Sequence, residues 1–146
     1  MLEQIGLFCF YGITALEDFR TKQIRLIEIA VFGIIGILID VMLRPYSLLS
    51  IIGGVLVGVV LYVFSIVTNE KIGKADALIV MVSGLYLGFM NILVLLWISS
   101  VFAAIGGGLF LLTIDRESTG DFDLPFMPFM LAGYMVLMFI NQTGGI

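Results

Sequence analysis

Long runs of residues without a charged side chain are separated by short charged segments along this chain. Uncharged runs cover residues 45–69, 77–114 and 124–146, and each reaches the roughly 20 residues with which a helix crosses a bilayer core. Two earlier apolar stretches, at about 4–16 and 26–43, are bounded by charged residues. We predict helices over these stretches and over about 47–67, because the strands of a membrane β-barrel would show alternating polarity instead.

The run 77–114 is too long for one membrane crossing. Its 38 residues would form a helix of about 57 Å, against a hydrocarbon core of about 30 Å. Gly88 and Asn91 favour a turn, so we predict a break at 88–91 and two helices joined by a tight hairpin. A last helix over about 126–140 follows Pro125 and carries Pro128 in its first turn. The sequence thus predicts an all-α integral membrane protein, a bundle of six transmembrane helices forming one domain over residues 1–146.

Basic residues orient this predicted bundle. Six of the seven fall in the first, third and fifth connecting loops, and only Arg44 lies on the other side. By the positive-inside rule these three loops are cytosolic and both termini are outside. No basic residue precedes the first apolar stretch, so we expect a retained helix rather than a secretory signal. The six are Arg20, Lys22, Arg25, Lys71, Lys74 and Arg116.

The composition of the chain limits the kinds of catalytic site, metal site and partner that it can have. Hydrophobic residues make up 61% of the 146 residues, mean hydropathy is +1.19 and only 18 side chains are charged, too few to cover a water-soluble protein. The chain has no histidine and one cysteine, Cys9, which excludes Cys/His zinc sites and catalysis by Ser/His or Cys/His pairs. A net charge of −4 argues against a nucleic-acid partner. We expect no cofactor and no metal.

Two aspartates, Asp18 and Asp76, stand where apolar runs meet the predicted cytosolic loops. Ionisable groups near membrane depth are costly and mark functional candidates. Two carboxyls from separate helices can activate water as an acid dyad. Asp18 ends a helix, where the dipole disfavours negative charge, whereas Asp76 begins one, where it favours charge. Helix dipoles alone therefore predict Asp76 as the base and Asp18 as the proton holder, whereas the positive charges of Arg20 and Lys22 near Asp18 favour the reverse.

The other carboxylates and the glycines have simpler interpretations. Glu3 and Asp40 fit interfacial solvation, whereas Glu17, Glu28 and Glu70 lie near basic residues that can pair with them. Glycines within the spans let membrane helices pack closely.

The segments around both aspartates resemble the two active-site segments of type IV prepilin peptidases, a family of GxGD-type intramembrane aspartic proteases. A basic segment follows Asp18, and a GxGD-like motif ends at Asp76, 58 residues later. A proline-rich stretch similar to the one that opens the family's last helix carries Pro125 and Pro128. Two positions depart from the pattern: Arg25 stands where a proline is expected, and Ala75 replaces the second motif glycine.

The resemblance implies an aspartic endopeptidase of the cell (cytoplasmic) membrane, multi-pass, with Asp18 and Asp76 as catalytic residues. The expected partners are the lipid bilayer and a prepilin or pilin-like precursor with a short basic leader. The first loop is short and lacks paired cysteines, so the chain is similar to minimal, peptidase-only members. The expected substrate-binding residues are Gly73, Lys74, Ala75, Pro125, Pro128, Asp121 and Asp123.

Alternatives remain at this point. The acidic fifth loop, which contains Asp121 and Asp123, is compatible with attraction of a basic leader and with ordinary solvation. A small proton- or cation-coupled transporter would also place aspartates at the membrane boundary. A third alternative is an inactive assembly partner that keeps the protease fold, which Ala75 would favour if that position requires glycine.

Overall fold

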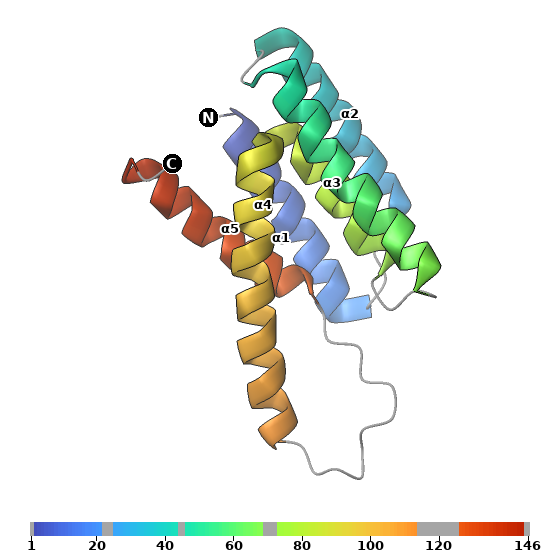
Figure 1. Ribbon diagram of the computed structural model, residues 1–146, viewed down its shortest axis with the longest axis vertical. Coiled ribbons are helices and arrows are strands. Elements are labelled where there is room, and N and C mark those ends of the chain that lie inside the picture. The colour runs from blue at the N-terminus through green and yellow to red at the C-terminus, as the bar shows by residue number, and fades with distance from the viewer. Residues whose placement is uncertain (1, 22–24, 44–45, 69–72, 114–125, 145–146) are drawn as a thin grey trace.

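The computed structural model describes residues 2–21, 25–43, 46–68, 73–113 and 126–144. These ranges form five helices and no strand (Figure 1), which confirms the all-α class for this part of the chain. The predicted helices at 26–43, 47–67 and 126–140 agree with the structure to within two residues at each end. The helices are α1 (Leu2–Thr21), α2 (Leu26–Leu43), α3 (Leu48–Val67), α4 (Lys74–Thr113) and α5 (Met127–Gln142).

Three of these helices, α2, α3 and α4, are long and apolar enough to cross a membrane. Their surfaces expose large apolar side chains, among them Met42 at 82% and Leu49 at 85% of their full area. Apolar surface of this extent is unfavourable in water and is covered when lipid surrounds it. The chain is therefore a membrane protein.

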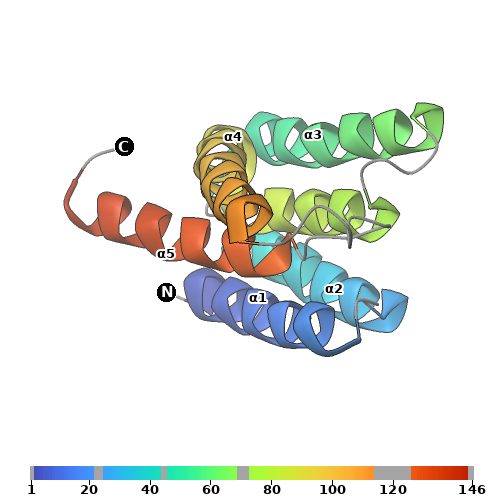
Figure 2. The same cartoon turned by 90° about the horizontal axis from the view of Figure 1, so that it is seen from below.

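Helix α4 changes direction at Gly88, inside the segment where the sequence predicts a break. Gly88 has φ 69° and ψ −178°, a left-handed backbone that glycine adopts without steric cost. A Cβ there would lie 2.6 Å from the Ser50 hydroxyl oxygen, and that oxygen accepts a hydrogen bond from the Phe89 N–H. The part of α4 after Gly88 leaves the direction of the part before it sharply and is seen nearly end-on in Figure 2.

The predicted break is wider than the observed one. Gly88 alone leaves the helical conformation, whereas Asn91 lies within α4. The Asn91 side-chain amide donates to the Leu87 carbonyl at 3.2 Å and to the Tyr46 hydroxyl at 3.4 Å. The amide thus bridges the kink, because a carbonyl freed inside an apolar bundle requires a partner. The structure accordingly divides the predicted run into two helical parts at Gly88, inside the predicted segment 88–91.

Glycines set the spacing between α3 and the first part of α4. A Cβ on Gly54 would lie 2.6 Å from the Gly84 carbonyl oxygen, and a Cβ on Gly84 would overlap the backbone of Gly54. A Cβ on Gly58 would overlap Met81. Close backbone approach through small residues is how membrane helices gain packing contacts without a hydrophobic drive, as the sequence predicts for these glycines.

Helices α1 and α5 complete the core. Phe10, Tyr11 and Tyr134 are almost fully buried, and the rings of Tyr11 and Tyr134 meet edge to face with centroids 5.3 Å apart. The second part of α4 crosses α5 and packs against it, since a Cβ on Gly106 would overlap the ring of Phe129. The core therefore joins α1, both parts of α4 and α5.

Gly84→Ala tests the close approach of α3 and α4. The added methyl overlaps the Gly54 backbone, and overpacking of this kind costs about 1–3 kcal/mol. We expect a lower thermal unfolding temperature in detergent, measured by circular dichroism. Gly108→Ala is the matched control on the same helix, because a Cβ there meets nothing within 4 Å. Equal melting temperatures for the two variants would contradict this packing.

Candidate active site

Asp18 lies in the last turn of α1 and is half-buried. Its Oδ2 accepts a hydrogen bond of 3.2 Å from the backbone N–H of Met127, the first residue of α5. The first N–H groups of a helix have no partner within the helix, so a carboxylate placed there satisfies one of them. This bond connects the C-terminal end of α1 to the beginning of α5.

Asp76 lies in the first turn of α4 and is also half-buried. Its side chain folds back over Gly73, where a Cβ would lie only 2.9 Å from the Asp76 Oδ2. The Gly73 carbonyl accepts the Ala77 N–H at 3.2 Å, which begins the helix. Gly73 therefore leaves room for the Asp76 carboxyl at the position where the helix starts.

The two aspartates lie near each other in space although 58 residues separate them. The end of α1 and the start of α4 lie at the same end of the molecule (Figure 1), which is consistent with an electrostatic effect of Asp18 on the Asp76 carboxyl. The Met127 N–H adds the start of α5 to this group. The end of α1 and the starts of α4 and α5 thus lie at one end of the molecule.

Lys74 and Ala75 lie in the first turn of α4, next to Asp76. The helical backbone at Ala75 is one that alanine favours. Gly88 is the residue named as non-helical within α4, so Ala75 in place of glycine places no backbone strain on this turn. Pro128 occupies the first turn of α5, one residue after the N–H that Asp18 binds.

Other expected site residues lie outside the described ranges. These are Pro125, Asp121 and Asp123, and their roles stay predictions.

Close to Asp18, the Glu17 carboxylate pairs with the Arg25 guanidinium at 3.6 Å, as the charge pattern predicts for Glu17. Arg25 therefore forms an ion pair between the end of α1 and the start of α2.

The Met127 N–H is the part of the site that sequence reasoning missed. A backbone donor leaves no residue-type signal, and the sequence indicates only that Pro125 and Pro128 bracket a helix start. Within the described residues, no cluster of three or more carboxylate or cysteine side chains offers a metal site. The available chemistry at this end is that of two neighbouring carboxyl groups.

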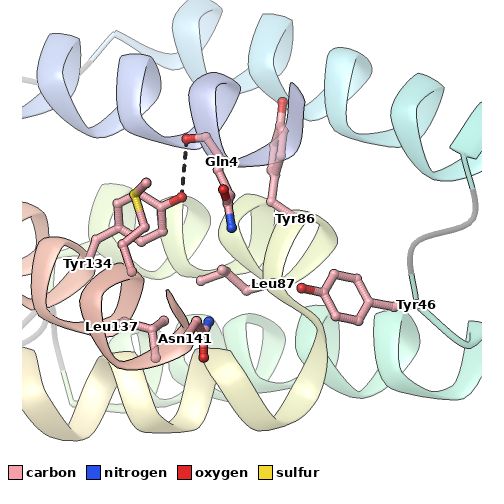
Figure 3. A pocket seen from close by; sticks show the side chains of 8 residues that line it. Gln4, Tyr46, Tyr86, Leu87, Tyr134, Leu137 and Asn141 are labelled. Atoms are coloured by element: carbon pink, nitrogen blue, oxygen red, sulfur yellow. Dashed lines mark hydrogen bonds between the residues drawn. The ribbon is translucent and has the colours of Figure 1, made fainter. Parts of the chain in front are cut away.

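A small pocket lies at the opposite end of α1 (Figure 3). It encloses about 50 Å³, room for several water molecules. The Tyr134 hydroxyl donates to the Gln4 carbonyl at its wall, 3.1 Å away. Its other polar side chains include Tyr86 and Asn141. The pocket contains neither aspartate and is separate from the carboxyl pair.

Comparison with known protein families assigns the chain to a family. The model of the type IV leader peptidase family matches residues 5–108, more than half of the sequence. The chain belongs to the type IV leader peptidase family. The matched range includes α2, α3, Asp18 and Asp76 and ends before α5. No curated protein and no solved structure matches the chain.

Gly73→Ala tests the packing of the Asp76 carboxyl against the helix start. The new methyl would force the carboxyl away from its position 2.9 Å from that point. We expect leader cleavage in detergent to fall by about tenfold, with the melting temperature unchanged. Gly12→Ala on α1 is the control, since a Cβ there meets nothing within 4 Å. An unaltered cleavage rate in Gly73→Ala would show that the Asp76 position does not depend on this glycine.

Proposed function

We propose that the protein is an aspartic endopeptidase that removes the short basic leader from prepilin or pilin-like precursors at the cytosolic boundary of the cell membrane. The proposal is supported by the positions of Asp18 and Asp76 at helix ends within electrostatic reach of each other, with Asp18 bound to the start of α5. Membership of the leader peptidase family supports the peptidase activity.

The residue inventory supports carboxyl chemistry over other proteolytic mechanisms. The chain contains no histidine, so a Ser/His or Cys/His nucleophile pair cannot form. Cys9 is exposed on α1 and precedes Asp18 by nine residues, about 13 Å along a helix. Carboxylates, lysine and hydroxyls remain as acid/base groups, and of these two neighbouring carboxyls, one ionised and one protonated, can activate water and protonate a leaving amine.

The hydrogen bond to Met127 suggests how the two roles divide. An N–H at a helix start that donates to a carboxyl oxygen stabilises the charged form of that carboxyl. In the proposed reaction Asp18 therefore accepts the proton of the attacking water, and Asp76 holds the proton that passes to the substrate carbonyl oxygen. This assignment reverses the one expected from helix dipoles within α1 and α4 alone, because α5 contributes its own N-terminus at Asp18.

The proposed membrane topology keeps six crossings, with each part of α4 crossing separately. Gly88 lies against Ser50 near the start of α3, at the end away from Asp76. The charge pattern places the ends that carry Asp18 and Asp76 in the cytosol and both termini outside. A substrate whose basic leader lies in the cytosol and whose apolar helix stays in the bilayer would present its cleavage site at this level.

Asp18→Asn and Asp76→Asn test the dyad separately. Each change removes one acid or base while keeping the size of the side chain, so we expect each to lower cleavage by at least about a thousandfold. The assay is cleavage of a synthetic precursor with a basic leader and an apolar helix, in detergent, followed by mass spectrometry.

Asp40→Asn serves as the control for this pair. Asp40 is a half-buried carboxylate near the far end of α2, and its replacement should leave the rate within about twofold. Persistent cleavage by Asp18→Asn or by Asp76→Asn would contradict a catalytic role for the two aspartates as a pair.

A further inference from the structure

A hydrogen bond between two side chains crosses the centre of the bundle. The Tyr11 hydroxyl on α1 donates to the Ser83 hydroxyl on α4 at 2.6 Å, and Ser83 in turn donates to the Ile79 carbonyl at 2.7 Å. Tyr11 is 1% exposed and Ser83 is fully buried. Hydroxyl groups are costly in such surroundings unless they are paired, so this pair joins the two helices at a defined place.

The position of the bond relative to the two aspartates is symmetrical. Tyr11 precedes Asp18 by seven residues, and Ser83 follows Asp76 by seven residues. Seven residues make a rotation only about 20° short of two full helical turns and a rise of about 10.5 Å. Tyr11 and Asp18 therefore share one face of α1, and Asp76 and Ser83 share one face of α4.

The contacts between these helices keep one antiparallel register. Asp18 lies near Asp76, Tyr11 bonds Ser83, and Gly6 lies against the ring of Tyr86, 3.4 Å from the place of a Cβ. Along this series the residue number falls on α1 as it rises on α4. A rotation of α1 by one residue would turn Asp18 by about 100° and break the bond at the same time.

We propose that Tyr11 and Ser83 are positioning residues for the reaction, whose hydrogen bond fixes the rotation and register of α1 against α4 so that Asp18 faces Asp76. The inference rests on the proposed function of the two aspartates. Neither hydroxyl reaches the carboxyls, since two helical turns lie between them. The bond acts through the geometry of the two helices.

Tyr11→Phe isolates this bond from the packing of the ring. The ring stacks near Phe10 and meets Tyr134 edge to face, and phenylalanine preserves both contacts. Ser83 keeps its bond to the Ile79 carbonyl, so no donor is stranded. We expect kcat for leader cleavage to fall by about tenfold while KM stays within about twofold, because orientation of the reacting groups is lost and substrate binding is not.

A double variant separates positioning from stability. Ser83→Ala alone leaves the Tyr11 hydroxyl buried without its acceptor and lowers the melting temperature. In Tyr11→Phe combined with Ser83→Ala, no hydroxyl is stranded, so the melting temperature recovers while kcat stays at the Tyr11→Phe level. A kcat that recovers together with the melting temperature would assign the bond a structural role only and overturn the proposal.

Tyr86→Phe is the matched control. The Tyr86 hydroxyl donates to the Phe32 carbonyl at 2.7 Å, so its loss removes a hydroxyl bond from the same part of α4 but affects the contact with α2. We expect its kcat to stay within about twofold of the unmodified protein. A tenfold fall here, equal to that of Tyr11→Phe, would show that any lost hydroxyl bond on α4 has the same effect.

A second measurement does not require peptidase activity. In a Cys9→Ser background, Asp18→Cys with Asp76→Cys would be bridged by a short bifunctional thiol reagent, and the bridged fraction followed by mass spectrometry. We expect bridging that slows by about tenfold when Tyr11→Phe is added and stays unchanged with Tyr86→Phe. Absence of bridging, or an equal rate with Tyr11→Phe, overturns the positioning role. Failure of the unmodified protein to cleave any leader, with bridging still dependent on Tyr11, would reject the proposed function alone.

Discussion

The hydrogen bond from the Met127 N–H to Asp18 is the contact on which the arrangement of the candidate site depends. It connects the last turn of α1 to the first turn of α5, and it gives a half-buried carboxyl a partner at the edge of an apolar bundle. A carboxyl without such a partner would be costly at that depth. With α1 and α5 joined there, the start of α4 brings Asp76 to the same end of the molecule.

Contacts between helices elsewhere in the bundle hold α1, α4 and α5 in the positions that this junction requires. The glycine contacts between α3 and the first part of α4 set how closely these helices approach. After the kink at Gly88, the second part of α4 crosses α5 and packs against it. The Tyr11–Ser83 bond then aligns α1 with α4 two turns from the aspartates. Membrane helices gain little from apolar contact with one another when lipid is the alternative, so backbone approach and buried hydrogen bonds carry much of the specificity.

Much of the fold follows from the sequence because charge and apolar length are strong signals in a membrane protein. The apolar runs locate α2, α3 and α5 to within two residues. The length of the run 77–114 requires an interruption, and Gly88 provides it. The sequence did not predict that Asn91 would hold the helix together across that point, because its amide has a turn-forming role in other contexts. Helix α1 also continues three residues past Asp18, where the sequence predicts its end, to Thr21.

Part of the candidate site could also be predicted from the sequence. Spacing and charge single out Asp18 and Asp76, and the bulk of the Asp76 carboxyl explains why glycine fits at Gly73. The partner of Asp18 was not predictable, because a backbone N–H is present at nearly every residue and only the tertiary structure selects Met127. That contact also changes the division of roles expected from the helix that carries each aspartate.

In the proposed function the two carboxyls act as one unit, with one ionised and one protonated. The most direct test is the dependence of kcat/KM on pH for cleavage of a basic-leader precursor in detergent. We expect a bell-shaped profile, because the rate falls when both carboxyls are protonated and again when both are ionised, and the two apparent pKa values belong to the pair. A rate that rises with pH to a plateau and never falls would contradict a protonated partner, and with it the dyad.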